Sequence, residues 1–450
     1  MGIHFGWSQT LEDKIDSLFT GWNIPNHPGG TVGVMKTGNI VFTEAYGLAS
    51  LEYLIPNNKK TLFNVGSISK QFTAMGIVLL EQQGRLSFDD DVHEFLPELP
   101  NFGHRITIRH LLHHTSGLRS FHDLLGLAGW RGDDNRSNSD LMQLLKQQKN
   151  LNFSPGESFS YCNSGYILLA EIIESITGQD FKTWMENSVF LPLGMTSTFV
   201  EDNYQRIVTN RATSYYHSHD NVYEMAQGYW AYTGAGNVYS TANDLLKWSQ
   251  NFYAPNNGWK EAFITIQTLD PLNDGSDSNY AFGLFIDEKF GQKRIQHAGV
   301  VGGFRAFLSI YPDEALSIVV LTNFSNARFG EKADAVANIL LENKITAPEP
   351  LCDKPFQESN SNMTTQDLSV YTGQFYSPEL KTHYSILLKG DALQWYQTRH
   401  GSHKMILTEE DVFKSDWPVE RIKFSRNKAG EIVGLYISNG RVHNLWLEKL

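Results

Sequence analysis

Residues 63–72 read FNVGSISKQF and place Ser67 three residues before Lys70. The apolar residues that follow have helical spacing, and three residues are close to one helical turn, so the two side chains share a face. A serine hydroxyl is a poor nucleophile until an adjacent base takes its proton, and a lysine is such a base only when its surroundings lower its pKa. The pair therefore predicts a serine nucleophile, although Ser425 and Lys428 repeat the spacing without a helical pattern.

The composition excludes several classes of partner. The chain has 450 residues, enough for a large core and more than one domain, and its 37 basic and 49 acidic residues give a net charge of 37 minus 49, or −12. This balance disfavours binding to nucleic acid or anionic lipid. We find no basic run, no apolar run of membrane-spanning length and no motif that implies a metal, nucleotide or flavin cofactor.

The cysteines and the N-terminal residues give information about the cellular compartment of the protein. Cys162 and Cys352 form no metal-binding cluster, and the sequence leaves open whether they pair or stay free. Residues 1–7, MGIHFGW, have neither a basic region nor an apolar leader. We expect a cytoplasmic protein from the chain as written, and a periplasmic or secreted one if a leader has been removed.

The pattern along residues 1–345 predicts an α+β domain. A helix is expected at 10–21 and a hairpin at 31–35 and 40–43, while residues 63–252 are mainly helical and loop-like. Strand patterns return over residues 280–286, 293–296, 304–311 and 315–322, and a helix over 329–342. Strands at both ends indicate one antiparallel sheet built from the two extremities, flanked by helices, with a helical region between them.

A second domain is expected at residues 365–450. Residues 346–364 are polar and proline-containing and predict a linker. Beyond it, short strand-like segments alternate with turns, which fits a small antiparallel all-β barrel or sandwich.

Two loops resemble a metal site and a phosphate-binding loop, but their residue patterns do not fit either. His110, His113 and His114 lack the glutamate of a zinc-binding helix, so we expect a hydrogen-bonded structural loop and no metal. Residues 233–237, TGAGN, lack the lysine of a phosphate loop. The glycines there are expected to let backbone approach backbone or a substrate closely.

Two further clusters stand with Ser67 in chain order. Tyr161-x-Asn163 lies just ahead of a predicted helix, where scaffolds commonly display catalytic side chains. His297-Ala298-Gly299 lies at the edge of a predicted strand pair and continues through Val300 into a glycine-rich turn.

Together these clusters resemble the serine beta-lactamase and penicillin-binding-protein superfamily, in which a serine-x-x-lysine, a tyrosine- or serine-x-asparagine and a lysine-threonine-glycine line one cleft. The likeness is closest to the branch of class C beta-lactamases, D-alanyl-D-alanine carboxypeptidases, D-aminopeptidases and beta-lactamase-like esterases. It covers residues 10–342, supported by LLHHTSGL at 111–118 and STANDL at 240–245. The terminal β domain is similar to the lipocalin-like extension of some peptidases of this group.

The resemblance implies a role for each matching residue. Ser67 would form an acyl-enzyme with help from Lys70, and Tyr161 would act as general base and return the proton to the leaving group. Asn163 would bind Lys70 or the substrate amide. The oxyanion hole would be the N–H groups of Ser67 and Val300, the residue after Gly299. Water would then release the acid.

The third motif departs from the family pattern. Where beta-lactamases have lysine and threonine, this chain has His297 and Ala298. Histidine is mostly neutral at pH 7 and alanine donates nothing, so binding of a substrate carboxylate should be weaker. This departure resembles D-aminopeptidase-like and esterase-like members.

We therefore expect a serine hydrolase that acts on a small peptide or amide. The alternatives are an esterase that uses the same residues, a beta-lactamase or D-Ala-D-Ala carboxypeptidase, and a non-catalytic protein that binds peptide or peptidoglycan. Each residue also has a purely structural interpretation: Ser67 as a helix cap, Tyr161 as a buried structural hydroxyl and His297 as a histidine that shapes the strand edge.

Overall fold

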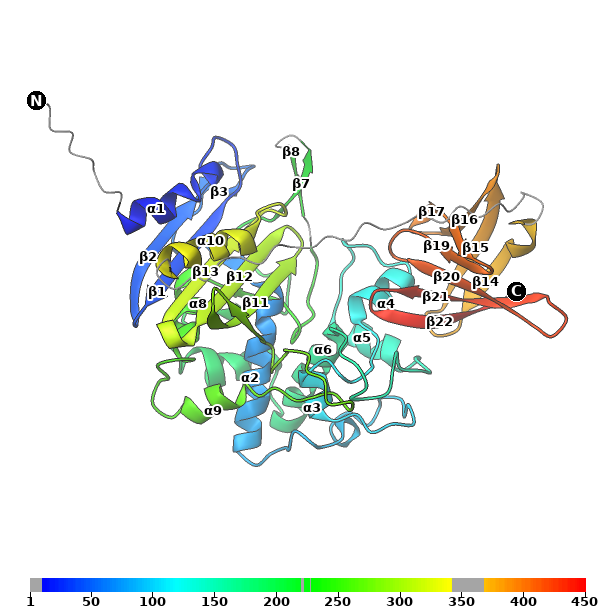
Figure 1. The fold of residues 1–450 in the computed structure, drawn as a ribbon, viewed down its shortest axis with the longest axis horizontal. Coiled ribbons are helices and arrows are strands. Elements are labelled where there is room, and N and C mark those ends of the chain that lie inside the picture. Colours follow the sequence, from blue (N-terminus) through cyan, green and yellow to red (C-terminus); the bar gives the residue numbers. More distant parts are fainter. Residues whose placement is uncertain (1–9, 220–221, 227, 342–367) are drawn as a thin grey trace, which may run out of the picture. The chain divides into compact units, whose positions relative to one another are not determined.

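The computed structural model describes residues 10–219, 222–226, 228–341 and 368–450. The chain forms two compact units (Figure 1). The first unit takes residues 1–87, 169–271 and 277–349, and the second takes 88–168, 272–276 and 350–450. Each unit is described by itself below.

A six-stranded antiparallel sheet forms the centre of the first unit, in the order β10-β11-β12-β13-β1-β2. Strands from both ends of this part of the chain meet where Gly30 of β1 pairs with Thr322 of β13. The predicted joining of the two extremities in one sheet is therefore confirmed. The strands are β1 (Gly30–Lys36), β2 (Asn39–Tyr46), β10 (Phe285–Lys289), β11 (Gln292–Val301), β12 (Phe304–Tyr311) and β13 (Leu316–Thr322).

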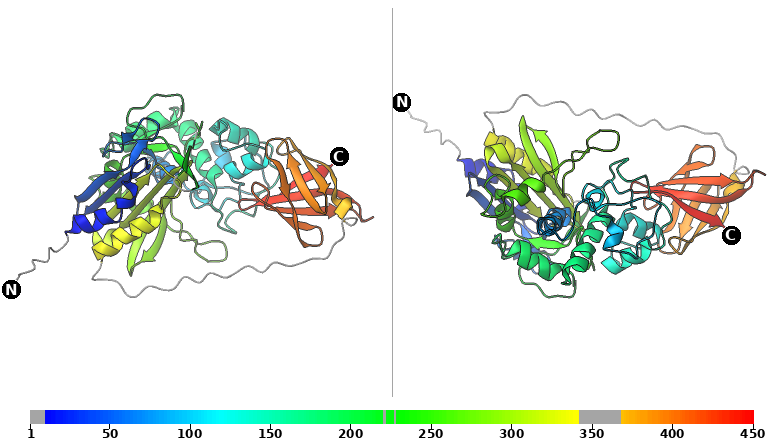
Figure 2. Two further views of the ribbon diagram at one scale, coloured as in Figure 1. Left: turned by 90° about the horizontal axis from the view of Figure 1, so that it is seen from above. Right: turned by 90° about the horizontal axis from the view of Figure 1, so that it is seen from below.

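Alternation along β1 gives each face of this sheet its own helices. Val32 and Val34 enter an apolar core with α1 (Leu11–Ser17) and α10 (Phe329–Leu341). Gly33 points to the other face, where a Cβ atom on it would lie 2.9 Å from Leu246 of α8 (Ala242–Gln250). Figure 2 shows α1 and α10 along one side of the sheet. This is the layered arrangement expected when a two-sided sheet buries both faces.

Shorter elements complete the first unit. The serine segment forms a 3₁₀ turn, η2 (Gly66–Ile68), that leads into α2 (Ser69–Gln82), and Gly84 follows with a φ of 68°. The helix α6 (Asn163–Thr177) begins within the residues of the second unit and ends within those of the first. The others are η1 (Thr20–Trp22), β3 (Leu48–Ser50), β4 (Ile55–Pro56), β5 (Phe63–Asn64), α7 (Phe181–Met185), the π-helical η4 (Glu186–Phe190), β6 (Phe199–Val200), β7 (Tyr215–His219), β8 (Val222–Met225), β9 (Val238–Ser240), α9 (Lys260–Thr265) and η5 (Pro312–Glu314).

The second unit joins short helices to a nine-stranded antiparallel sheet. The strand order is β17-β16-β15-β14-β22-β21-β20-β19-β18, and its two outer strands are consecutive in the chain, so the sheet curls into a nearly closed barrel. Its elements are η3 (Val92–Glu94), α3 (Ile108–Leu112), α4 (Phe121–Leu127), α5 (Asn138–Leu145), η7 (Ser369–Tyr371), β14 (Gly373–Ser377), β15 (Thr382–Lys389), β16 (Ala392–Gln397), β17 (Gly401–Lys404), β18 (Ile406–Glu409), β19 (Val412–Lys414), β20 (Arg421–Arg426), β21 (Ile432–Asn439) and β22 (Val442–Lys449).

A buried ion pair ties the barrel to the helices of the second unit. Arg119, just before α4, is 1% exposed and its Nη1 lies 2.7 Å from Oε2 of Glu379, which is 4% exposed. The same guanidinium donates to Gln148 and to the backbone oxygen of His443, and the Lys149 N–H donates to Glu379. Burial lowers the pKa of Arg119, while Glu379 opposes that shift.

Some predicted boundaries need correction. The strand predicted at 280–286 begins at Phe285, because Ala281–Leu284 form a tight turn closed by the Ala281 N–H and the Leu284 oxygen. In the second domain the sequence predicts strands at 382–388, 392–396, 404–407, 421–424, 432–437 and 442–447, and it misses β14 and β19. The predicted linker 346–364 and Cys352 lie outside the described residues, and the domain boundaries stay a prediction. Within the described ranges, no helix has the length and apolar character to cross a membrane.

Removing the counter-charge of Arg119 should destabilise the second unit. We expect Glu379→Leu to lower the free energy of unfolding by about 3–5 kcal/mol, because a buried guanidinium would lose its carboxylate. Urea unfolding followed by tryptophan fluorescence measures this change. Glu44→Leu, which breaks the exposed Lys59–Glu44 pair, is the control and should cost at most about 1 kcal/mol. The double change Arg119→Met with Glu379→Leu should recover part of the loss, and an unchanged midpoint for Glu379→Leu alone would contradict the assignment.

Candidate active site

The turn that carries Ser67 is held by side chains on either side of it. Gly66 has a φ of 53°, a conformation that favours glycine. Its N–H donates to Asn64 Oδ1 at 3.0 Å and its carbonyl accepts from Ser69 Oγ at 2.6 Å. Ser67 is half-buried at the start of the helix. The nucleophile candidate therefore lies on a backbone that is fixed from both sides.

Lys70 is fully buried and bonded to Ser67. Its Nζ donates to Ser67 Oγ at 3.3 Å and to the Ala235 oxygen at 2.7 Å. One turn later, Thr73 Oγ1 donates to the Gly234 oxygen at 2.7 Å. The glycine-rich loop 233–237 thus turns two carbonyl groups to side chains of α2, and the expected close approach of its backbone to another backbone or a substrate stays a prediction.

The third motif lies directly against the serine turn. A Cβ atom on Gly299 would sit 1.9 Å from the Val65 oxygen, and one on Gly66 would sit 2.7 Å from the Val300 nitrogen. No side chain fits between the two segments, so the Val300 backbone nitrogen borders the turn that bears the Ser67 N–H. This is the neighbourhood that the predicted oxyanion hole requires.

His297 is buried beside Lys70 and is neutral. Its Nδ1 lies 2.6 Å from the Ala298 oxygen, which can only accept, so Nδ1 carries the proton and Nε2 accepts from the Tyr280 hydroxyl at 3.3 Å. Burial and then the charge of Lys70 lower the pKa of His297 to about 3, against the opposing effect of the bond to Ala298. The third motif therefore supplies no cation at pH 7.

The second unit holds Tyr161 and Asn163 at the start of α6. The Tyr161 ring lies 4.3 Å from the His114 ring, centroid to centroid, and His114 Nδ1 accepts from the Cys162 N–H at 3.1 Å. Asn163 is buried, and its N–H donates to Ser120 Oγ. Cys162 is buried as well, which raises the pKa of its thiol. These contacts fix the position of Tyr161 in its unit.

The histidines near 110 serve this loop, as the hydrogen-bonded reading predicted. His110 Nδ1 accepts from the Thr107 N–H and closes a capping box on α3. His114 holds the Cys162 backbone and has a φ of 60°. The histidines therefore shape the segment that precedes Tyr161.

The predicted site residues divide between the two units. The first unit brings together Ser67, Lys70, His297, Gly299 and Val300. The second unit holds Tyr161 and Asn163, and their joint action with Ser67 stays a prediction.

Three residues of the site were not predicted. Asn64 and Ala235 hold the serine turn and Lys70 through atoms that no motif marks. Arg441 of the barrel lies over the Tyr161 ring, with its guanidinium carbon 5.1 Å from the ring centroid. Asn64 could have been noticed because it lies within the serine stretch, residues 63–72. Arg441 could not, because a contact between residues 161 and 441 leaves no pattern in the sequence near either residue.

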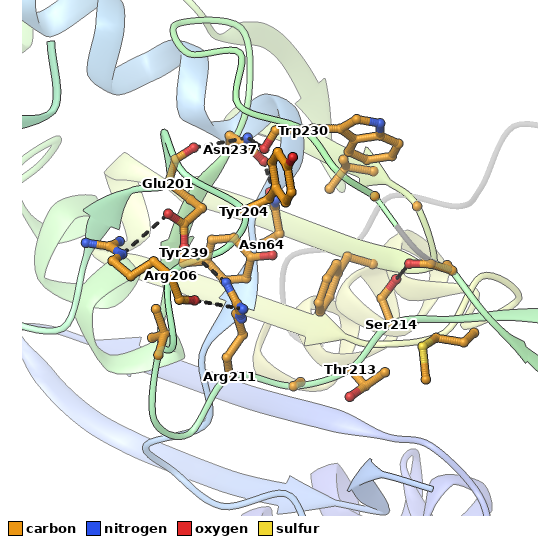
Figure 3. A pocket seen from close by; sticks show the side chains of 18 of the residues that line it. Asn64, Glu201, Tyr204, Arg206, Arg211, Thr213, Ser214, Trp230, Asn237 and Tyr239 are labelled. Carbon is orange, nitrogen blue, oxygen red and sulfur yellow. Dashed lines mark hydrogen bonds and ion pairs between the residues drawn. The ribbon is translucent and has the colours of Figure 1, made fainter. Parts of the chain in front are cut away.

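A polar pocket of about 450 Å³ lies in the first unit, bordered by Asn64 and by Val301, the neighbour of Val300. Figure 3 shows Arg206 and Arg211 directed at Glu201, which is 3% exposed. The Arg211 Nη1 lies 3.0 Å and the Arg206 Nε 3.4 Å from its carboxylate. Two cations around one carboxylate leave this wall of the pocket with a net positive charge.

Comparison with known proteins identifies the family of the chain. The family described as Beta-lactamase matches residues 17–341. Penicillin-binding protein 4* of Bacillus subtilis (strain 168) is 30% identical over 387 residues, which cover 82% of this chain and 83% of that protein. A D-aminopeptidase of Cereibacter sphaeroides is 30% identical over 344 residues, and the match covers 76% of this chain but only 64% of that protein's length.

Among solved structures, the octameric penicillin-binding protein homologue from Pyrococcus abyssi shares the fold with a TM-score of 0.65 at 21% identity, covering 96% of this chain and 98% of that one. The family match spans most of the chain and includes the serine turn, the Tyr161 segment and β11. The predicted superfamily and fold class are confirmed, and the chain belongs to the beta-lactamase family.

Proposed function

We propose that the chain is a serine hydrolase that cleaves a peptide or amide bond through an acyl-enzyme, in the manner of a D-aminopeptidase. The observation that carries the proposal is the contact of buried Lys70 with Ser67 Oγ, directly beside the Val300 backbone nitrogen. The D-aminopeptidase relatives support the predicted hydrolase and its substrate class.

In the proposed reaction, Ser67 Oγ attacks the substrate carbonyl while its proton passes to Tyr161, assisted by Lys70. The N–H groups of Ser67 and Val300 stabilise the oxyanion. The proton then moves from Tyr161 to the leaving nitrogen, and the carbon–nitrogen bond breaks. Water attacks the resulting ester, and the acid leaves.

The chemistry of the third motif favours substrates that present no carboxylate to it. His297 is neutral and Ala298 has no hydroxyl, so neither supplies the charge-assisted bonds that a carboxylate needs. An amide or ester substrate whose group facing His297 and Ala298 is uncharged therefore fits the site better than one with a carboxylate there. An esterase that uses the same residues is the second candidate, because Ser67 and Lys70 serve both bonds equally.

A fluorophosphonate probe should label the protein at Ser67, because the reagent captures activated serine nucleophiles. We expect Ser67→Ala to abolish labelling. Lys70→Met should slow labelling by at least about 100-fold, because proton transfer to the general base contributes about 10²–10⁴-fold and Lys70 assists that transfer. Intact-mass spectrometry gives the stoichiometry and the rate. The Ser425→Ala and Lys428→Met variants, at the second serine-x-x-lysine, are matched controls and should label like the wild type. Labelling that survives Ser67→Ala would remove the proposal.

A substrate panel should separate amidase from esterase. We expect turnover of D-alanine p-nitroanilide in preference to its L-isomer, and slow turnover of nitrocefin, whose carboxylate would meet the neutral third motif. Absorbance assays give kcat/KM for each compound, with p-nitrophenyl acetate as the ester. Turnover of esters alone would favour the esterase, and rapid nitrocefin hydrolysis would favour a beta-lactamase.

The neutral state of His297 should appear as a pH dependence of stability. Its pKa in the folded protein is about 3 and that of an unfolded histidine is about 6.5, so the unfolded state takes up the proton first as pH falls below 6.5. Between pH 7 and pH 5 the wild type should lose about 2 kcal/mol more stability than His297→Asn does. Urea unfolding at the two pH values measures both losses. Equal losses in the two proteins would show that folding leaves the pKa of His297 unchanged and would contradict a lowered pKa.

A further inference from the structure

The turn between β21 and β22 is fastened to the helical part of the second unit. The Arg441 carbonyl accepts from the Ser120 N–H at 3.3 Å and from Asn152 Nδ2 at 3.1 Å. Asn152 Oδ1 accepts in turn from the His443 N–H at 2.8 Å. Asn152 therefore binds the backbone on either side of Val442, where β22 begins. The backbone that presents Arg441 is held by these bonds and by the Ser120 N–H, close to the segment that bears Tyr161.

The side chain of Arg441 extends from this tip over the Tyr161 ring at 5.1 Å. A guanidinium at this distance stabilises the negative charge of a phenolate. The guanidinium itself stays protonated at every pH that the protein tolerates. Arg441 is exposed, so water screens part of the effect. The ring face alone also attracts the cation.

We propose that Arg441 is a positioning residue for Tyr161, which supplies from the barrel a fixed positive charge that favours the phenolate form of the catalytic base. The proposal rests on the function given to Tyr161 above. In chemical terms Arg441 exchanges no proton: Tyr161 takes the proton of Ser67 as phenolate and returns it to the leaving group as phenol.

Other titratable groups lie near the contact between Arg441 and Tyr161. His114 faces the Tyr161 ring from the loop after α3. Asp123 of α4 interacts with Arg441, whose charge opposes the rise that burial causes in the pKa of Asp123. Lys70 is the partner expected from the proposed function. Arg441 is thus the permanent cation that the second unit itself brings to Tyr161.

The test is the pH dependence of Ser67 labelling by an uncharged fluorophosphonate, in the full-length protein. The labelling rate can be measured without knowing the substrate. Because the probe has no carboxylate, a change in carboxylate binding cannot alter the rate. In Arg441→Met, the pH of half-maximal labelling rate should rise by about one unit, the lower end for a charge at this distance. At pH 7 the rate should fall about tenfold, and it should return to the wild-type plateau at high pH.

Controls separate this role from a structural one. Arg441→Lys should keep the wild-type profile, and Lys428→Met, in another hairpin turn of the barrel, should leave it unchanged. Equal loss of rate at every pH would mean that Arg441 only holds the fold and would overturn the proposal, as would an unshifted profile in Arg441→Met. Wild-type protein that is not labelled at Ser67 would refute the proposed function itself, and the inference with it.

Discussion

The backbone of β11 lies on the turn that carries Ser67, with no side chain between them. Gly66 and Gly299 make this possible, because any Cβ atom there would collide with the Val300 nitrogen or the Val65 oxygen. A close backbone contact fixes distances more rigidly than a side-chain contact, since no rotamer can change it. The rest of the first unit follows from this contact: the sheet holds β11, and α2 leaves the turn with Lys70 pointing back to Ser67.

The same contact explains why a histidine suits the third motif. His297 lies in β11 close enough to Lys70 for the lysine charge to lower the histidine pKa. Two buried cations so close together would repel each other, and each would lose hydration. A neutral imidazole avoids both costs and still holds its ring through Ala298 and Tyr280. As a consequence, the His297-Ala298-Gly299 motif brings no second cation to the site. A substrate carboxylate therefore finds no charged partner at this motif.

Local patterns predicted much of the fold and part of the site. The serine helix, the β1–β2 hairpin and the joining of both chain ends in one sheet follow from apolar periodicity and turn residues, which act over a few positions. Ser67, Lys70 and His297 could be named because each sits in a short motif. The edge of β10 was misplaced because Tyr280 to Leu284 are as apolar as a strand, yet they form a turn.

What the sequence could not predict depends on contacts between distant residues. Asn64, Ala235 and Arg441 carry no motif, and only folding brings the last of them to Tyr161. The short β19 has too few residues for a visible alternation. Whether Ser67 and Tyr161 act together, and in which compartment the protein works, stay predictions.

The barrel is a structural part of the second unit. Arg119 has almost no exposed surface at which water could hydrate its charge, so it depends on Glu379 for neutralisation. Glu379 belongs to the barrel and Arg119 to the helical segment, so separating the two parts would break this ion pair and the hydrogen bonds around it. These contacts favour the arrangement of helices and barrel in which the turn between β21 and β22 places Arg441 over Tyr161. A barrel that moved as an independent lid would have to break this pair at each opening, together with the hydrogen bonds that join Arg119 to Gln148 and His443 and Glu379 to Lys149.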